Sequence, residues 1–422
     1  MSSLSIAQAS CADDYDPNSM PVDKARAFIH RFLEPVRGTL RVPVRSSLGR
    51  VLAENVVSPV NVPAHRNSAM DGWALRGADL AAAGETTLEE IGVSFAGKPF
   101  TGKVQAGQCV RIMTGGVVPE GADTVVMQER AKANGKSVSF AAGQKPGQNV
   151  RQAGEDLQAG SVALRRGRIV RPAELGLIAS LGIGEVAVYR PLRVAYFSTG
   201  DELKGVGTPL GEGEIYDSNR YTLHGMLQRL GCEALDMGVV RDDPESLERA
   251  FAEAAANADV VITSGGVSVG EADFVKGMLG KLGEVVFWKI AMKPGRPLAY
   301  GKIGGAHFFG LPGNPVSVMV TFYQFVRDAL LVLSGADPVQ PVPTFHATCT
   351  AKLKKAPGRT EFQRGILTRG PEGQLQVRPT GEQGSGILKS MSDANCFIIL
   401  GDSTGNVEPG TTVEVQLLEG IV

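Results

Sequence analysis

The clearest hydrophobic pattern of the chain lies in residues 191–335, where short apolar runs alternate with amphipathic stretches. The runs Arg193–Phe197 and Asp259–Thr263 are rich in β-branched and aromatic residues, which is typical of buried strands. The stretches Asn219–Leu230 and Pro244–Ala256 have the spacing and flanking residues of helices. Strand, helix, strand and helix in this order predict βαβ units and a parallel sheet. Ligands of such sheets bind beyond the carboxyl ends of the strands.

Two other segments have the short alternating runs and frequent glycines of β structure. Residues 63–155 contain the runs Cys109–Met113 and Thr124–Met127, and we expect a small β-rich module there. The segment after residue 336 ends with the alternating run Thr412–Leu417, and its length fits a small barrel. The chain is therefore expected to be a multidomain protein of the α/β plus β class.

Composition narrows the class of protein. The 53 glycines and 24 prolines make up 77 of 422 residues, above the usual share of about 12%. They are dispersed among 43% hydrophobic residues, which excludes a collagen-like or disordered chain. The 43 basic and 44 acidic residues leave a net charge of −1. This balance argues against general binding of nucleic acid or of a membrane surface, but it leaves room for a local anion site.

The cysteines and the apolar segments indicate a cytoplasmic location. Five widely spaced cysteines without a CxxC motif fit a reducing compartment and exclude a disulfide scaffold or a cysteine zinc site. Residues 1–23 contain four aspartates and no basic residue, and we expect residues 1–18 to be a disordered tail. The apolar stretch Val316–Leu333 contains Gln324, Arg327 and Asp328, which favours a core helix over a membrane span.

A glycine-rich turn follows the predicted strand Asp259–Thr263, in the sequence from Ser264 to Asp273. Backbone N–H groups of such a turn, together with the start of the next helix, favour an anion. The alternative is that these glycines form a tight turn that binds no anion. Gly266–Gly270 also matches the GxSxG motif of serine hydrolases. That reaction needs a histidine downstream, where the sequence offers only His307 and His346. His307 lies in an apolar run that fits a core position better.

Charged residues collect at the predicted strand ends. The carboxylates are Asp201, Glu202, Asp217, Asp242, Asp243 and Asp273. If these strand ends converge, several carboxylates could hold Mg²⁺ against phosphate oxygens. Helix capping is the simpler alternative for Asp217 and Asp243. Lys289 and Lys293 lie four residues apart, and residues 352–364 contain five basic residues and one acidic residue. A set of basic side chains facing the glycine-rich turn could bind an oxyanion.

Taken together, the motifs resemble those of the MoeA family, the molybdopterin molybdenumtransferases, from about residue 20 to the end of the chain. The stretches that carry the resemblance are Asn67–Gly72, Arg111–Gly115, Gly154–Asp156, Phe197–Leu203, Ile215–Asn219, Asp242–Asp243, Ser264–Asp273, Lys293–Pro297 and Leu311–Ser317. Each is short, and their common order and spacing make the resemblance specific. Arg296 stands where many relatives have lysine.

The resemblance implies a homodimer with four domains in each chain. A discontinuous linker and dimerisation domain would comprise residues 19–62 and 156–190. Residues 63–155 would form a distal β-rich domain, residues 191–335 an α/β molybdopterin-binding domain, and residues 336–422 a C-terminal β-barrel.

The resemblance also implies the reaction, in which molybdate is inserted into adenylylated molybdopterin and AMP is released. Mg²⁺ is the expected metal, with Zn²⁺ as the other possibility. Glu202, Asp242 and Asp273 would position the metal and the pyrophosphate. Gly265, Gly266 and Ser268 would line the adenylyl-phosphate pocket. The molybdate ligands would be Lys289, Lys293, Ser317, Arg364 and Ser385. The catalytic residues Asp71, Thr114 and Asp156 match positions near the same cleft, where the distal domain of the partner chain would close over it.

The implied partners are the enzyme that adenylylates molybdopterin and the factors that accept the finished cofactor, with no nucleic acid and no membrane. A scaffold related to the E domain of gephyrin is one alternative function. Gephyrin carries an additional adenylylating domain and a long linker that this sequence does not show, which favours the enzyme. A GxSxG serine hydrolase is the other alternative.

Overall fold

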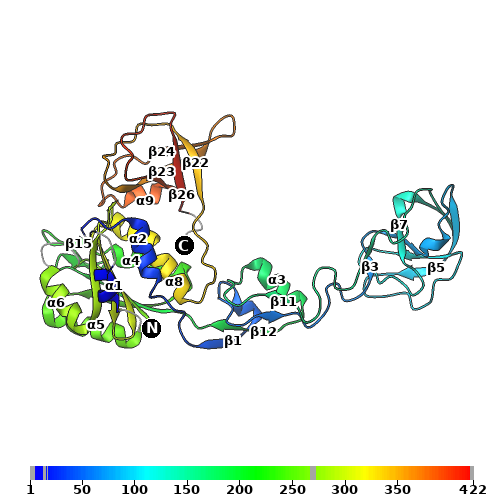
Figure 1. Ribbon diagram of the computed structural model, residues 1–422, viewed down its shortest axis with the longest axis horizontal. Coiled ribbons are helices and arrows are strands. Elements are labelled where there is room, and N and C mark those ends of the chain that lie inside the picture. The colour runs from blue at the N-terminus through cyan, green and yellow to red at the C-terminus, as the bar shows by residue number, and fades with distance from the viewer. Residues whose placement is uncertain (1–4, 13–15, 17, 267–271, 419–422) are drawn as a thin grey trace. The chain divides into compact units, whose positions relative to one another are not determined.

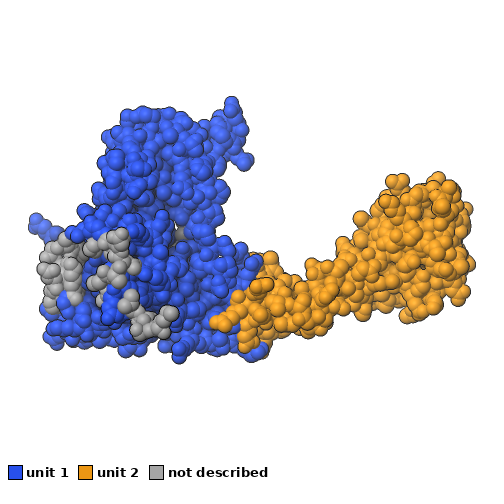
Figure 2. Space-filling model, viewed as in Figure 1, with its two compact units in different colours: residues 1–53, 167–171, 187–422 blue, residues 54–166, 172–186 orange. Residues whose placement is uncertain are grey.

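The computed structural model describes residues 5–12, 16, 18–266 and 272–418. The chain divides into two compact units, shown in separate colours in Figure 2. Unit 1 comprises Met1–Ala53, Gly167–Arg171 and Ala187–Val422, and unit 2 comprises Glu54–Arg166 and Pro172–Val186. Each unit has hydrophobic cores of its own.

Unit 1 is built around a six-stranded sheet with the strand order β16-β13-β17-β21-β20-β18. The strands are β13 (Arg193–Thr199), β16 (Glu233–Val240), β17 (Val260–Ser264), β18 (Gly283–Lys289), β20 (Pro297–Ile303) and β21 (Ala306–Leu311). The first four in the spatial order are parallel, as predicted. The chain adds β16 on one side of β13 and β17 on the other, so the strand order reverses beside β13. Such a reversal leaves a crevice at the carboxyl ends of the strands.

The sheet is mixed, because β20 pairs antiparallel with both β21 and β18. The predicted all-parallel sheet is therefore wrong at this edge. The physical reason is the connection between β20 and β21, which consists only of Gly304 and Gly305. A parallel connection needs a dozen or more residues, whereas a two-residue turn forms a hairpin. Gly304 supplies the positive φ of +56° in this turn.

Helices cover both faces of this sheet (Figure 1). They are α2 (Val22–His30), α4 (Asn219–Arg229), α5 (Pro244–Asn257), α6 (Ala272–Leu282), α7 (Pro315–Thr321) and α8 (Arg327–Leu333). Neighbouring residues of a strand face opposite sides, and Phe309 packs in the core with α2, α4, α7 and α8. Phe308 packs with α5 and α6 in the other core. Both faces of the central strands are therefore buried, as their continuous apolar sequence predicts.

One long helix connects the six-stranded sheet of unit 1 to its C-terminal barrel along the chain. It runs through α7, a π-helical turn at Phe322–Val326 and α8. Pro315–Leu333 is long and apolar enough to cross a membrane by length and composition, but 67% of its most apolar window is buried inside the protein. That degree of burial is what the predicted core helix requires.

The N-terminal tail differs from its prediction. Residues Ile6–Ala12 form helix α1, and Ile6 and Ala9 are 3% and 5% exposed. The backbone N–H of Ile6 donates to Glu284 Oε2 at 2.9 Å, beside strand β18. The expectation of a wholly disordered tail is thus wrong for these residues. Two apolar residues three positions apart give a short helix one face that the sheet can cover.

The C-terminal part of unit 1 is a closed barrel, as predicted. Its strands are β22 (Thr344–Cys349), β23 (Thr360–Arg369), β24 (Leu375–Pro379), β25 (Cys396–Leu400) and β26 (Thr412–Leu417). The barrel closes because β23 pairs with both β24 and β25. The short strand β19 (Met292–Lys293) runs parallel to β23 and joins the barrel to the central sheet domain.

Unit 2 contains the β-rich module predicted at residues 63–155. Its sheet has the order β7-β4-β6-β5-β9-β8. The strands are β4 (Gly72–Leu75), β5 (Thr86–Ser94), β6 (Gln108–Ile112), β7 (Thr124–Met127), β8 (Ala131–Asn134) and β9 (Ser137–Phe140). Helix α3 (Pro172–Ser180) and two short strand pairs complete the unit. The predicted four-domain boundaries are finer than this division and stay a prediction.

Candidate functional site

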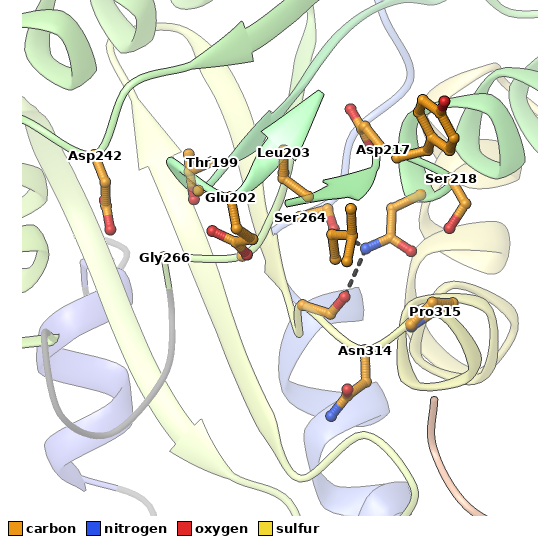
Figure 3. Close-up of a pocket in the computed structure, with 16 residues that line it drawn as sticks. Thr199, Glu202, Leu203, Asp217, Ser218, Asp242, Ser264, Gly266, Asn314 and Pro315 are labelled. Carbon is orange, nitrogen blue, oxygen red and sulfur yellow. Dashed lines mark hydrogen bonds between the residues drawn. The ribbon is translucent and has the colours of Figure 1, made fainter. Parts of the chain in front are cut away.

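A cavity of about 380 Å³ opens at the carboxyl ends of β13, β17 and β21 (Figure 3). Four kinds of segment line it: the strand ends, the turns that follow them, the short strand β15 (Ile215–Tyr216) and the start of α4. The lining residues are Thr199, Gly200, Glu202, Leu203, Ile215, Tyr216, Asp217, Ser218, Asn219, Asp242, Ser264, Gly265, Gly266, Gly313, Asn314 and Pro315. This position is the crevice expected where the strand order reverses.

The turn after β17 requires glycine at two positions. Gly265 has a φ of +93°, and a Cβ atom there would lie 2.6 Å from the backbone oxygen of Thr199. Gly266 has a φ of +68°, and its Cβ would lie 2.9 Å from Thr199 Oγ1. L-residues rarely adopt these φ values, and a side chain would fill the space between two strand ends. The turn therefore lets backbone approach a ligand closely.

The Asp217 carboxylate forms hydrogen bonds with other residues of the protein. Its buried carboxylate, 1% exposed, accepts hydrogen bonds from Ser198 Oγ at 3.0 Å and from Arg220 Nε at 3.1 Å. The backbone N–H of Arg220 donates to it as well, so Asp217 caps the start of α4. Arg220 makes a second, bidentate contact with Asp236 on β16. Capping, the simpler alternative, is therefore the observed role of Asp217.

Asn219 is fixed in one orientation. Its Nδ2 group donates to Gly313 O at 2.6 Å and to Ser264 Oγ at 2.8 Å. Its Oδ1 atom is buried without a hydrogen-bond partner, and so is Thr199 Oγ1. The side chains of both residues belong to the cavity wall, and both residues are less than a tenth exposed.

Sequence reasoning missed Thr199 and Asn219 as site residues. Their positions in the sequence could have indicated them, because Thr199 lies at the end of a strand and Asn219 lies in the first turn of a helix.

Two of the three carboxylates predicted to bind a metal line this cavity. Glu202 and Asp242 come from the segments after β13 and β16, and Figure 3 shows both on the same side of the cavity as Gly266. The Glu202 carboxylate lies over Gly200, where a Cβ would be 2.6 Å from Oε2. The side chain of Asp273 and the whole of Ser268 lie outside the described residues. Among the residues that are described, no three His, Cys, Asp or Glu side chains form a cluster that could hold a metal.

A second cavity, of about 460 Å³, lies at the barrel. Its wall includes three lysines, Lys293, Lys352 and Lys354, together with the loop at residues 381–384. Lys293 Nζ lies 3.5 Å from Glu361 Oε1, and the Lys293 side chain is 51% exposed. Lys352 forms an ion pair with Glu408, and Glu382 also lines the cavity, so carboxylates compensate part of this positive charge.

Arg364 binds the loop that lines this second cavity. The residue is 1% exposed, and its guanidinium donates to Ser390 Oγ and to the backbone oxygens of Glu382, Gln383 and Gly384. Burial lowers the pKa of the guanidinium. The observed contacts position the loop, whereas the predicted contact with molybdate stays a prediction.

The same loop reaches the long helix of unit 1. Ser385 O accepts a hydrogen bond from the backbone N–H of Val316 at 3.1 Å, next to the buried Ser317 in α7. Lys289 ends β18, and its backbone oxygen accepts a hydrogen bond from Met20 N at 3.0 Å. The predicted molybdate residues therefore come from segments that meet in the structure at the α7 and β19 side of the barrel.

The remaining predicted residues belong to unit 2. Asp71 Oδ1 accepts two hydrogen bonds of 2.7 Å, from the backbone N–H and the hydroxyl of Thr114. These bonds, the backbone bond first, lower the pKa of Asp71, and the nearby charge of Arg111 acts in the same direction. Asp156 is exposed, and its backbone N–H donates to Val62 O. Contact of these residues with the cavity of unit 1, through a partner chain, stays a prediction.

The histidine needed by a hydrolase lies at the wrong end of the sheet. His307 pairs with Val260, whereas the turn begins after Ser264, four residues and about 13 Å further along β17. His307 is buried, with its Nδ1 3.4 Å from Tyr300 Oη. The cavity wall contains no histidine among the described residues. This geometry opposes the hydrolase alternative.

The fold and the cavity define a multidomain protein with an α/β domain whose cavity lies at the carboxyl ends of its strands, extended by a β-barrel and a separate β-rich unit. Three family models cover most of the chain. They are the MoeA N-terminal region (domain I and II) at residues 20–182, the "probable molybdopterin binding domain" at residues 195–331, and the MoeA C-terminal region (domain IV) at residues 346–418. The chain belongs to the MoeA family of enzymes.

Individual relatives agree with this assignment. A molybdopterin molybdenumtransferase from Haemophilus influenzae is 46% identical over 94% of this chain and 98% of its own length. The crystal structure of a molybdopterin biosynthesis MoeA protein from Pyrococcus horikoshii superposes with a TM-score of 0.81 at 29% identity, covering 95% of this chain and 100% of that one. Gephyrin from Dictyostelium discoideum is 33% identical over 95% of this chain, which corresponds to 62% of gephyrin.

Proposed function

We propose that this protein inserts molybdate into adenylylated molybdopterin, with release of AMP, in the biosynthesis of the molybdenum cofactor. The main support for the proposal is that unit 1 of this MoeA-family chain contains two cavities with different linings. One has the glycine turn and the carboxylates that a nucleotide phosphate and its metal require. The other is lined by lysines that suit an oxyanion.

The first cavity would bind the phosphate end of the adenylylated substrate. Gly265 and Gly266 leave room for phosphate oxygens against backbone, and the N-terminus of α4 lies at the same wall. The start of a helix attracts negative charge. The substrate phosphate is thereby held beside the carboxyl ends of β13 and β17, where its bond to the dithiolene half can be cleaved.

Glu202 and Asp242 fit a hard divalent cation that also contacts phosphate. The Glu202 carboxylate lies against Gly200 in the cavity wall and would serve as an oxygen ligand. Oxygen donors without histidine or cysteine favour Mg²⁺ over Zn²⁺. When bound, such an ion would neutralise charge on the phosphates and polarise the bond to be cleaved. Asp273 is proposed as a further ligand.

The second cavity and its neighbours would hold molybdate, a tetrahedral dianion. Lys289, Lys293, Ser317 and Ser385 would supply ammonium and hydroxyl donors, and Arg364 is proposed to act on the same anion. Lys352 and Lys354 add positive charge to the same hollow. No nucleophilic side chain is required, because the dithiolene sulfurs of the substrate receive the metal.

The proposal includes a homodimer in the cytoplasm. In it, Asp71, Thr114 and Asp156 of one chain would complete the site of the other. An adenylylating enzyme would supply the substrate, and factors that load molybdoenzymes would accept the product.

The proposal is tested with purified protein, adenylylated molybdopterin, Mg²⁺ and molybdate. We expect AMP release that depends on molybdate, together with a product that activates a cofactor-free molybdoenzyme. Asp242→Asn should lower the rate of AMP release by at least tenfold while the protein remains folded. The absence of AMP release by the wild-type protein under these conditions would contradict the proposal.

A further inference from the structure

A buried carboxylate lies behind the wall of the second cavity. Glu361, near the start of β23, is 5% exposed, and it is not among the described residues that line the cavity. Its backbone is held on both sides, because β23 pairs with β19 at Lys293 and with β25 at Leu400. Burial of a charged group costs free energy unless partners compensate the charge. The partners of Glu361 therefore indicate its role.

Both oxygens of the carboxylate contact residues of the cavity wall. Oε1 lies 3.5 Å from the ammonium nitrogen of Lys293, and Oε2 accepts a hydrogen bond of 3.0 Å from Gln363 Nε2. The same amide group also donates to the backbone oxygen of Lys354, at 2.9 Å. Lys293, Gln363 and Lys354 all line the second cavity. Glu361 is thus connected to three parts of the wall from behind.

A second cation, Lys355, interacts electrostatically with the Glu361 carboxylate. Lys355 is 6% exposed, and its ammonium group donates, at distances between 2.9 and 3.4 Å, to the backbone oxygens of Ala356, Asp402 and Thr404. These three bonds use all three N–H donors of a lysine. Lys355 therefore compensates charge without replacing the contacts of Glu361 with the cavity wall.

Two lysines of the wall differ in how firmly their ammonium groups are held. Lys352 pairs with Glu408, and these side chains are 54% and 64% exposed. Exposed pairs hold their side chains weakly, because water competes for both charges. The Lys293 side chain is 51% exposed, but the side chain of its partner Glu361 is only 6% exposed and is bound by the Gln363 amide. Lys293 therefore has a fixed partner, unlike Lys352.

We propose that Glu361 is a positioning residue of the second cavity, which holds the Lys293 ammonium group where an oxyanion binds. A lysine side chain has many rotamers, and fixing one of them before the anion arrives lowers the entropic cost of binding. One N–H of the ammonium group is directed to Glu361, and the other two remain for oxygens of the anion. This inference rests on the proposed function, because molybdate is the anion proposed for this cavity.

The sign of the effect distinguishes positioning from charge. A carboxylate close to an anion repels it, so charge alone predicts that Glu361→Gln strengthens anion binding. Positioning predicts weaker binding. The amide of the variant has one oxygen in place of two, whereas Lys293 and Gln363 Nε2 both donate, so the two contacts cannot both be kept in this geometry.

The experiment measures how AMP release by the full-length protein depends on molybdate concentration, with adenylylated molybdopterin and Mg²⁺ at saturation. Glu361→Gln should raise the KM for molybdate about tenfold, as expected for one lost charge-assisted hydrogen bond, and leave kcat within about twofold of wild type. Glu361→Asp keeps the charge but withdraws the carboxylate by one methylene group, and it should raise this KM as well. Glu408→Gln is the matched control, because it removes a carboxylate beside another lysine of the wall. It should leave the KM for molybdate unchanged or lower it.

A double-mutant cycle tests whether Glu361 acts through Lys293. Lys293→Ala should raise the KM for molybdate, and the addition of Glu361→Gln should then have little further effect. If Glu361 acted independently of Lys293, the two effects would multiply. Urea denaturation of each variant establishes that the compared proteins are folded.

Three results would overturn the inference: a KM for molybdate in Glu361→Gln that equals or falls below that of wild type, wild-type behaviour of Glu361→Asp, and effects that multiply in the double variant. Each is compared with wild-type protein that releases AMP, so these outcomes leave the proposed function intact. If the wild-type protein releases no AMP, calorimetry measures binding of molybdate alone. A tenfold weaker binding by Glu361→Gln would then support the inference, whereas equal affinity or no binding by either protein would overturn it.

Discussion

At the scale of single residues, some buried polar side chains of unit 1 have all their contacts within the protein, whereas others keep an atom without a hydrogen-bond partner. The Asp217 carboxylate is bound by Ser198 and Arg220, and the Arg364 guanidinium is bound by a loop. Both are polar, buried and fully engaged in holding the fold. Thr199 and Asn219 are equally buried but each has an atom without a partner. Residue type alone does not distinguish these two groups, because the difference lies in the contacts.

Gly265 provides a test of the turn. Gly265→Ala should destabilise unit 1 by about 2 kcal/mol, since the positive φ and the contact with the Thr199 oxygen both disfavour a Cβ. It should also weaken AMP binding. Urea denaturation and calorimetry measure the two effects. The control is Gly225→Ala in α4, where a Cβ meets no atom within 4 Å, and it should be neutral or stabilising. Equal behaviour of the two variants would contradict the assignment.

His307 should make stability depend on pH. Burial lowers its pKa from 6.5 to about 4, with Lys302 acting in the same direction and Asp259 opposing it. Tyr300 is its hydrogen-bond neighbour. Because the folded-state pKa is the lower one, the unfolded chain binds a proton first as the pH falls below 6.5. The free energy of unfolding should therefore decrease by about 3 kcal/mol between pH 6.5 and 4 through this group.

The measurement is urea denaturation of wild type and His307→Gln across this pH range. The variant should have a shallower slope. His346→Gln on β22 is the control, because that residue is exposed, and it should keep the wild-type slope. A His307→Gln slope equal to that of wild type would refute the effect.

At the scale of elements, connection length decided where the sheet stops being parallel. The crossovers through α4 and α5 are long enough for parallel neighbours, whereas the turn of Gly304 and Gly305 forces β20 and β21 into a hairpin. The edge strand β18 is then covered by the short helix α1. Ile6 and Ala9 are the buried apolar residues of this helix among its described side chains.

Helix α1 leads to a prediction about stability. Ile6→Ala should lower the free energy of unfolding of unit 1 by about 2 kcal/mol, because Ile6 is 3% exposed in the main core. Gln8→Ala changes an exposed position of the same helix and should have little effect. Chemical denaturation of both variants measures the difference. An Ile6→Ala midpoint equal to that of wild type would show that α1 does not pack on the sheet in solution.

At the scale of the whole molecule, the chain consists of two units with separate cores. Phe140 is fully buried in unit 2, where its ring packs against Trp73, and Phe251 is buried in the α5 and α6 core of unit 1. Among the residues that the structure describes, these two rings belong to different hydrophobic clusters. Separate cores favour separate unfolding transitions.

Calorimetric unfolding tests this independence. Phe140→Ala should lower one transition by roughly 10 °C, because removal of a buried ring costs about 3 kcal/mol or more. Phe251→Ala should lower the other transition instead. AMP binding at temperatures below both transitions should be unaffected by Phe140→Ala, since the cavity proposed to bind the substrate phosphate belongs to unit 1. A single transition that both variants shift equally would contradict two independent units.

The sequence by itself determined the local elements and the family. Continuous apolar runs predicted β13 and β17, alternating runs predicted the strands of unit 2 and the barrel, and glycines at 265 and 266 marked the turn at the cavity. These features follow from local rules of burial, periodicity and backbone conformation. Short motifs in a common order were enough to indicate the MoeA family, which the comparisons confirm.

The tertiary structure decided which polar groups are already satisfied. Asp217 is a cap bound to Arg220, while Asn219, two residues later, keeps a free acceptor because Gly313 and Ser264 fix its amide from other strand ends. Those partners are distant in sequence, so no local pattern could reveal them. The same holds for the hairpin at β20 and for the packing of Ile6, both of which depend on which surfaces meet when the chain folds. Hydrogen-bond satisfaction is a property of the assembled fold, because the partners of a buried polar group come from segments that are distant in the sequence.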